Sequence, residues 1–241
     1  MKDKTVLITG GTSGIGYEMI KSLYKDNKLI VVAKDKKKLD KLLDDFDNIS
    51  IYQADLSIMD DISNVSNKIM DDFEFIDVLI NNAAIQYSPV FFDADFEYET
   101  IEKEITVNFT AVCSLTYVCL PLLLKSKDGI ILNVNSGLAL TPKTTSAVYC
   151  ATKGAINIFT QSLRNQLEYT NISVLQVFLE LVDTQMTKGR GENKMEAKEA
   201  AKQIIYGIEN KIEDHDIGKV KLLRLLLRFI PSISKSIMKK Y

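Results

Sequence analysis

The chain of 241 residues is 46% hydrophobic and 26% charged, so it can bury one sizeable core and is expected to form a single domain. Its 30 basic and 32 acidic residues nearly cancel, which excludes the strongly basic surface of a nucleic-acid-binding protein. Three irregularly spaced cysteines and one histidine cannot supply a set of zinc ligands, so no metal site is expected.

Apolar runs alternate with segments of helical spacing along the chain. The first strand is predicted so close to Met1 that no signal peptide fits before it, and we expect a cytoplasmic protein. Strands are predicted at 5–9, 28–33, 49–53, 76–80, 129–135 and 172–178, and helices at 14–25, 35–46 and 58–72. Strands this uniformly apolar are typical of a parallel sheet covered by helices on both faces. The sequence predicts a single doubly wound, Rossmann-type α/β domain of three layers, with residues 1–241 in one unit.

The candidate binding and catalytic residues directly follow the predicted strands. They are Gly10–Gly16, Asp55, Asn81–Ala84, Ser136 and Val182–Thr184. Ligands of such folds bind beyond the carboxyl ends of the strands. We therefore expect these loops to converge on one site.

Gly10, Gly14 and Gly16 form a G-x-x-x-G-x-G pattern between the first strand and the first helix. Glycines at such a turn let a pyrophosphate approach the helix N-terminus, where free N–H groups and the helix dipole favour anions. No Gly-Lys-Ser/Thr follows, which disfavours a nucleotide hydrolase. The pattern predicts a dinucleotide site.

The end of the second strand reads Ala33, Lys34 and Asp35. An acid at this place binds the ribose 2′-hydroxyl of NAD, whereas a cation pairs with the 2′-phosphate of NADP. Ala33 stands where a selective acid is expected and Lys34 follows, so NADP is favoured. Asp35 keeps NAD possible, and the lysines could instead be the solvated start of a helix.

Tyr149 and Lys153 are one helical turn apart, and Ser136 ends a predicted strand upstream. Residues at i and i+4 share a helix face, so the ammonium would favour the phenolate of Tyr149 and make it an acid-base catalyst. Two other Tyr–Lys pairs with this spacing occur near the first helix, so the spacing alone indicates little. The hydroxyl residue at the end of a strand distinguishes this pair.

Taken together, these residues resemble the classical short-chain dehydrogenase/reductase family over nearly the whole chain. The resemblance implies that Tyr149 is the general acid/base, that Lys153 lowers its pKa and binds the nicotinamide ribose, that Ser136 orients the substrate oxygen, and that Asn108 supports a proton-relaying water. It also implies cofactor contacts from Gly10, Thr12, Ser13, Gly14, Ile15, Gly16, Lys34, Asp55, Leu56, Asn82, Ala83, Ala84, Tyr149, Lys153, Val182 and Thr184.

Two positions depart from the pattern of this family. Ala84 replaces a glycine, which the turn tolerates if its φ stays negative. Leu179-Glu180 replaces the usual Pro-Gly, so the carboxylate of Glu180 either approaches the substrate mouth or faces solvent, and the second is favoured.

Residues 185–200 are expected to form a mobile lid over the substrate, and residues 138–146 a second wall. The tail 219–241 has seven Lys or Arg and no Asp or Glu among many leucines, and a similar tail occurs in sequences resembling the DltE-like branch of the family. Its leucines could pack on the domain or a second subunit, which is favoured, or lie on an anionic membrane surface. It is too short to span a bilayer.

The sequence therefore predicts an oxidoreductase that transfers a hydride between NADP and a small carbonyl or alcohol substrate, working as a homodimer or homotetramer. The substrate itself cannot be identified from these residues. A catalytically silent sensor or scaffold that binds the dinucleotide is the alternative, but all four catalytic positions are retained. An epimerase or dehydratase of nucleotide sugars is disfavoured because such chains are usually longer and have a different glycine spacing.

Overall fold

A computed structural model describes residues 1–240 of the chain, and Tyr241, the end of the expected tail, lies outside them. The predicted alternation of strands and helices is present. The first half contains β1 (Thr5–Thr9), α1 (Gly14–Leu23), β2 (Lys28–Ala33), α2 (Lys36–Asp45), β3 (Ile49–Gln53), α3 (Met59–Asp72), β4 (Val78–Asn81), α4 (Glu99–Ile105), η1 (Thr106–Thr110) and α5 (Ala111–Leu124). The second half contains β5 (Gly129–Ser136), η2 (Gly137–Ala139), α6 (Ala147–Gln166), β6 (Ile172–Leu179), β7 (Val182–Asp183), η3 (Gln185–Thr187), β8 (Met195–Glu196), α7 (Ala197–Glu209), β9 (Asp214–Asp216), α8 (Val220–Phe229) and α9 (Pro231–Lys239).

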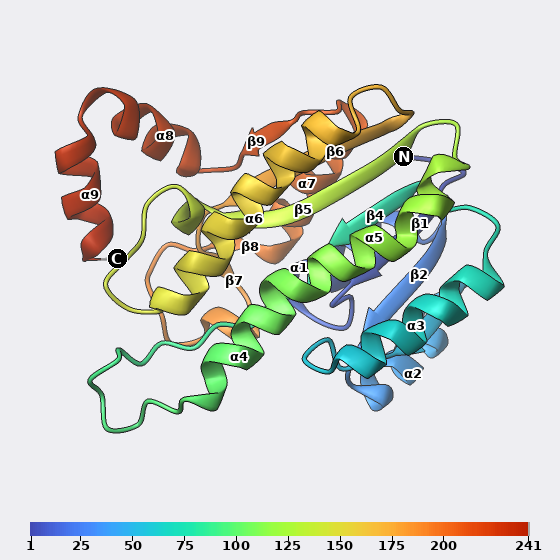
Figure 1. Cartoon of the computed structure of the whole chain (residues 1–241), viewed down its shortest axis with the longest axis horizontal. Helices are drawn as coiled ribbons and strands as arrows, with labels where there is room; N and C mark the ends of the chain where they lie inside the picture. Colours follow the sequence, from blue (N-terminus) through green and yellow to red (C-terminus); the bar gives the residue numbers. More distant parts are fainter. Residues whose placement is uncertain (241) are drawn as a thin grey trace.

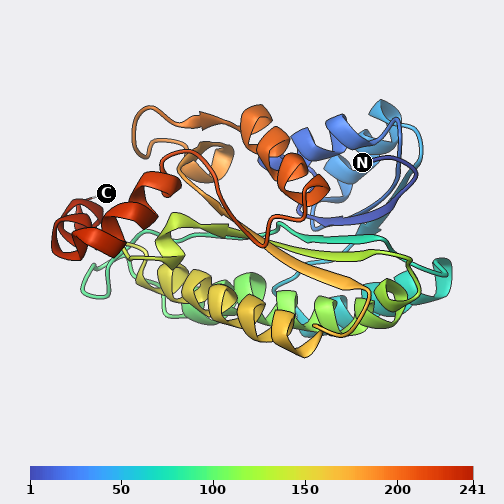
Figure 2. The same ribbon diagram turned by 90° about the horizontal axis from the view of Figure 1, so that it is seen from above.

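The main sheet has the strand order β3-β2-β1-β4-β5-β6-β9, and every neighbouring pair is parallel. Helices cover both faces: α1, α2 and α7 lie on one side, and α3, α5 and α6 on the other (Figures 1 and 2). This confirms the predicted three-layer, doubly wound fold.

Burial on both faces explains why the strands read as continuous apolar runs. In β1, Val6 and Ile8 pack against the layer that contains α1, whereas Leu7 packs against the layer that contains α3. All three side chains are 0% exposed. Successive side chains of a strand point to opposite faces, so a strand covered on both sides needs an apolar residue at every position.

The segment Glu99–Leu124 is long and apolar enough to cross a membrane by length and composition alone. Half of its most apolar window is buried inside the domain. Leu115 and Cys119 of α5 are each 1% exposed and belong to the core beneath the sheet. The hydropathy of this segment is therefore explained by packing against α3 and the sheet.

The strand order reverses between β1 and β4, so the loops that follow these two strands diverge to opposite sides of the sheet. In doubly wound folds this switch point forms the ligand-binding crevice. The loops after β1, β2, β3, β4, β5 and β6 meet along this rim.

The expected lid is shorter in the structure than the predicted segment 185–200. The helix α7 begins at Ala197, and Ala200 is 0% exposed against the core. The connection between η3 and β8 remains as the exposed part, with Gly189 and Gly191 at positive φ. The tail forms the two helices α8 and α9, which project from one end of the domain (Figures 1 and 2).

Candidate active site

A cavity of about 720 Å³ runs along the carboxyl rim of the sheet. It gathers the loops that follow β1 to β6, which include every loop that the sequence analysis expects to converge. The predicted residues that line it are Gly10, Thr12, Ser13, Gly14, Ile15, Gly16, Lys34, Asp55, Leu56, Asn82, Ala83, Ala84, Ser136, Tyr149, Lys153, Val182 and Thr184. Asn108 is the predicted catalytic residue that lies behind the wall, 1% exposed.

The glycine loop is shaped for an anion. Gly10 has a φ of +69°, and a Cβ on Gly16 would lie 2.3 Å from the Gly10 carbonyl oxygen. The Ser13 side chain at the start of α1 makes no capping hydrogen bond, and no acid occupies the first turn. The N–H groups of this turn therefore have no side-chain acceptor, and the helix dipole adds partial positive charge there. These residues fit the pyrophosphate of a dinucleotide.

The adenosine end of the cavity contains an ion pair. The ammonium of Lys34 lies 2.5 Å from the carboxylate of Asp55. Burial opposes ionisation of Asp55, but hydrogen bonds from Lys34 and Ser57 outweigh it and lower its pKa to about 2. Asp35 accepts a hydrogen bond from the Lys38 N–H at 3.1 Å and so caps α2. The acid that could bind a ribose hydroxyl is therefore engaged in holding a helix.

The segment after β4 is fixed to the glycine loop by hydrogen bonds. The amide of Asn82 donates to the carbonyls of Thr9 and Gly10 at 2.9 and 3.2 Å. The Thr9 hydroxyl accepts from the backbone N–H of Asn82 and of Ala83, each at 3.0 Å. Ala84 does not adopt a positive φ, so the turn accommodates a methyl where the family has glycine.

Tyr149 is 8% exposed at the wall of the cavity. Burial raises the pKa of its hydroxyl well above the ordinary value, and the nearby Cys150 and Glu104 raise it further. The charge of Arg190 and the neighbouring Ser136 side chain act in the opposite direction and lower it. Ser136 also accepts a hydrogen bond from the Leu138 N–H at 3.2 Å, which fixes its hydroxyl beside the phenol.

Lys153 differs from the sequence expectation in its partner. Its ammonium donates to the Val134 carbonyl at 2.9 Å and lies 5.6 Å from the centroid of the Tyr149 ring. A buried ammonium needs an acceptor, which Val134 supplies, and burial lowers the pKa of Lys153 to about 8. The expected effect of Lys153 on the Tyr149 pKa stays a prediction.

Asn108 lies in the single π-helical turn η1, between α4 and α5. Its amide exchanges two hydrogen bonds with the backbone of Ile85, both at 2.9 Å, and donates to the Thr152 hydroxyl at 3.3 Å. Such turns are frequent at functional sites because they re-aim one side chain. Asn108 thereby ties the segment after β4 to the helix that carries Tyr149.

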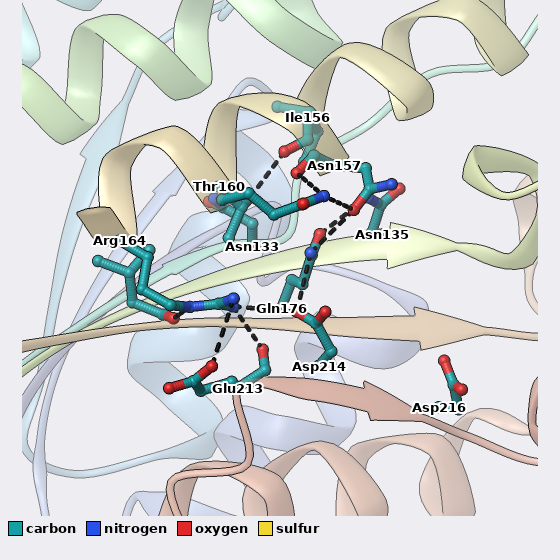
Figure 3. Close-up of polar contacts among 12 residues, drawn as sticks. Asn133, Asn135, Ile156, Asn157, Thr160, Arg164, Gln176, Glu213, Asp214 and Asp216 are labelled. Carbon is teal, nitrogen blue, oxygen red and sulfur yellow. Dashed lines mark hydrogen bonds and ion pairs between the residues drawn. The ribbon is translucent and has the colours of Figure 1, made fainter. Parts of the chain in front are cut away.

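A buried polar network connects Asn135 and Gln176 with Asn157 and Asp214 (Figure 3). The Asn135 amide donates to the Lys153 carbonyl at 3.2 Å and to Gln176 at 3.3 Å, and its oxygen accepts from the Ser136 N–H at 2.9 Å. Gln176, 0% exposed, donates in turn to Asn157 and Asp214, both at 3.0 Å. Asn135 therefore connects two of the predicted catalytic residues through one side chain.

The loop that replaces the usual Pro-Gly corrects one expectation. The Glu180 side chain is 11% exposed and lines the cavity, so it does not face solvent. Its carboxylate lies 3.5 Å from the ammonium of Lys219, at the start of the tail. A Cβ on Gly218 would lie 1.9 Å from Glu180, so the absence of a side chain at Gly218 makes room for this carboxylate.

Three charged residues that the sequence analysis did not single out lie at or near the site. Lys143 and Arg190 line the cavity, and Glu104 is 2% exposed behind Tyr149. Arg190 donates to the Ser88 hydroxyl at 3.2 Å and to the Met186 carbonyl. The sequence gives no signal for any of the three, because Glu104 lies among the charged residues of α4 and Lys143 and Arg190 lie in polar loops.

Comparisons with known proteins agree with this arrangement. The family model for short chain dehydrogenases matches residues 4–195. An uncharacterised oxidoreductase of Staphylococcus epidermidis is 31% identical over 213 residues, which cover 86% of this chain and 92% of that protein. DltE of Bacillus subtilis, also an uncharacterised oxidoreductase, is 34% identical over 76% of this chain and 73% of its own. A solved short-chain dehydrogenase from Sphingobium yanoikuyae, in complex with NADPH, has a TM-score of 0.81 at 28% identity and covers 96% of this chain and 95% of that chain. The chain therefore belongs to the short-chain dehydrogenase family of NAD(P)-dependent oxidoreductases.

Proposed function

We propose that this protein transfers a hydride between NADP(H) and a carbonyl or alcohol substrate, with Tyr149 as the general acid/base. The observation that carries the proposal is that the side chains of Tyr149 and Ser136 line the same cavity as a glycine loop shaped for a pyrophosphate. The dinucleotide, when bound, supplies or accepts the hydride.

The residues of the chain perform the proton chemistry and hold the substrate. The Ser136 hydroxyl, fixed by the Leu138 N–H, donates a hydrogen bond to the substrate oxygen. The raised pKa of Tyr149 keeps its hydroxyl protonated near neutral pH, so it can donate a proton to that oxygen in the reducing direction. In the oxidising direction the same hydroxyl must first lose its proton, which Arg190 and Ser136 favour.

The end of β2 supports NADP as the cofactor. Lys34 lies at the adenosine end of the cavity, and its side chain is 66% exposed, which leaves its ammonium accessible beyond the contact with Asp55. Asp35 is engaged as the cap of α2. A 2′-phosphate therefore meets a cation here, and one oxygen of the Asp35 carboxylate is already occupied by the N-terminus of α2.

The substrate half of the cavity supports a carbonyl compound that has both an apolar part and an anionic group. Apolar walls come from Leu138, Met186 and Leu223. Lys143 and Arg190 add two cations: burial and then the charge of Arg190 lower the pKa of Lys143. Two cations that close together repel each other until an anion lies between them.

The function is tested with purified protein, NADPH and a panel of ketones and aldehydes, by following the loss of NADPH absorbance. The variant Tyr149→Phe should lower kcat by at least about 100-fold, because general acid catalysis contributes about 10²- to 10⁴-fold. Its Kd for NADPH should stay within about twofold of the original. Tyr169→Phe, at a side chain that is 94% exposed, is the matched control and should keep full turnover. Undiminished turnover by Tyr149→Phe would refute the assignment.

The cofactor and substrate preferences need separate measurements. NADPH should bind more tightly than NADH, and Lys34→Gln should narrow that difference; tighter binding of NADH would contradict the NADP assignment. Lys143→Gln should raise KM about tenfold for 4-oxopentanoate, because a charge-assisted hydrogen bond is lost, and leave KM for its methyl ester unchanged. If Lys143→Gln changed KM equally for the acid and for its methyl ester, the proposed anionic group of the substrate would be excluded.

A further inference from the structure

The helices α8 and α9 carry an apolar stripe that stays exposed among the residues that the structure describes. We use this name for Leu222, Leu225 and Phe229 of α8 together with Ile230, Ile233 and Ile237, at and within α9; these side chains are between 41% and 67% exposed. In each helix the three residues follow the spacing i, i+3, i+7, which places them on one face. Single exposed apolar residues are normal on a protein surface, but a gathered set marks an interaction site.

The other side of the same two helices is packed on the domain. Val220 is 2% exposed, and Leu223 and Met238 line the substrate half of the cavity. Arg224 forms two hydrogen bonds to Asp216, at 2.5 and 2.8 Å. The helices therefore have a fixed orientation, and the apolar stripe is not required for their attachment. Figures 1 and 2 show both helices projecting from one end of the molecule.

The charges around the apolar stripe identify what it can bind. Residues 219–241 contain seven Lys or Arg and no Asp or Glu, so all 32 acidic residues of the chain lie elsewhere. Of these cations, Arg224 is paired with Asp216 and Lys219 with Glu180. Lys221, Arg228, Lys235, Lys239 and Lys240 are exposed.

A second copy of this chain is a poor occupant of the apolar stripe. A two-fold contact sets the same patch against itself, so the exposed cations of both copies would face each other. Like charges across an interface are unfavourable. An anionic lipid surface supplies the complementary sign, and a juxtaposed Lys or Arg gains about 1 kcal/mol from it.

We propose that α8 and α9 dock this enzyme on a bilayer that contains anionic lipid. The apolar stripe enters the boundary between headgroups and acyl chains, and the exposed cations contact the headgroups. The helix α8 has 10 residues and α9 has 9, so each is about 15 Å long and lies in the interface instead of spanning a core of about 30 Å. Because Leu223 and Met238 line the cavity from the same two helices, its substrate half lies next to the lipid surface.

Co-sedimentation of the full chain with vesicles tests the proposal. We compare vesicles of phosphatidylcholine with vesicles that also contain phosphatidylglycerol. The chain should pellet with the anionic vesicles at least about tenfold more strongly than with phosphatidylcholine alone, and salt should weaken the binding. The double variant Leu225→Ser with Phe229→Ser should lose at least about tenfold in affinity, because two large apolar side chains no longer leave water.

A matched control separates docking from a general loss of apolar surface. Leu43→Ser with Met70→Ser removes two side chains that are 48% and 44% exposed on α2 and α3, and it should pellet as the original chain does. Equal NADPH affinity in all variants verifies that each is folded. The proposal would be overturned if the original chain stayed in solution in the presence of anionic vesicles. It would also be overturned if the Leu225→Ser, Phe229→Ser variant pelleted as strongly as the original chain. A third outcome would also overturn it: light scattering that shows the original chain to be a dimer without lipid and this variant to be a monomer. A second copy would then cover the apolar stripe.

Discussion

The buried carboxyl of Glu104 gives the protein a pH-dependent stability that one substitution should remove. Glu104 is 2% exposed on α4 and accepts one hydrogen bond, from the Tyr87 N–H at 3.0 Å. Burial raises its pKa from the ordinary 4.5 to about 7, and the bond from Tyr87 only partly opposes this. The folded state therefore holds the proton of Glu104 more tightly than the unfolded chain does.

The sign and size of the effect follow from linkage. Stability rises with pH where the unfolded state binds more protons, and here the folded state binds more, so stability falls as pH rises. The loss begins near the unfolded pKa of 4.5 and is complete above about pH 7. Each pKa unit corresponds to about 1.4 kcal/mol, so the whole loss amounts to roughly 3 kcal/mol.

Urea unfolding of the original chain and of Glu104→Gln, at about pH 5 and about pH 8, measures this loss. Glutamine keeps an oxygen for the Tyr87 N–H and carries no charge. The variant should match the original chain at the lower pH and exceed it by up to roughly 3 kcal/mol at the higher pH. Glu102→Gln, at an exposed position of the same helix, should retain the pH dependence of the original chain. The same decline of stability in Glu104→Gln and in the original chain would refute the reasoning.

Three further predictions concern neighbouring parts of the molecule. Asn135→Ala removes the hydrogen bonds to the Ser136 N–H and the Lys153 carbonyl, so it should lower kcat about tenfold and leave NADPH affinity unchanged. A kcat equal to that of the original chain would show that these bonds do not position the site. Gly16→Ala should abolish NADPH binding measured by fluorescence, because its Cβ would collide with the Gly10 carbonyl; Gly154→Ala, whose Cβ meets nothing within 4 Å, should bind normally. Arg224→Ala should expose α8 to limited proteolysis, because its ion pair with Asp216 is lost, and Arg228→Ala should not; equal cleavage of the two variants would contradict this.

Local pattern was enough to predict six of the seven strands of the main sheet, all but β9. The strands β2 and β3 begin and end at the predicted residues, 28–33 and 49–53. Each is an apolar run bounded by polar or turn residues, and a strand buried in the sheet must be apolar at nearly every position. The glycine loop was also predictable from local pattern. Gly10 and Gly16 lie where a side chain would collide with the backbone, so only glycine fits there.

Electrostatic relations between distant segments were not predictable. The sequence places Lys153 one turn from Tyr149, but it does not show that Val134, on a neighbouring strand, supplies the acceptor for the ammonium. It gives no sign that Arg190, from the lid, lies near enough for its charge to lower the pKa of Tyr149. Each of these contacts joins residues brought together by the crossovers of the sheet, and no local periodicity encodes them.

The place of Glu180 shows how such a contact connects two parts of the protein that the sequence presents as separate. A carboxylate in a largely buried wall needs a partner, and Lys219 provides it from the first residue of the tail. Lys219 directly precedes Val220, which is packed under the wall, and α8 then continues to Leu223 at the cavity. The replacement of Pro-Gly by Leu-Glu and the basic tail are therefore one structural feature: the carboxylate holds the start of α8 in place, and α8 closes the substrate half of the cavity. Glu180→Gly should accordingly loosen α8 and raise KM for an apolar ketone, measured by steady-state kinetics. Its NADPH affinity, measured by fluorescence titration, should stay unchanged. An unaltered KM would show that Glu180 does not act through α8.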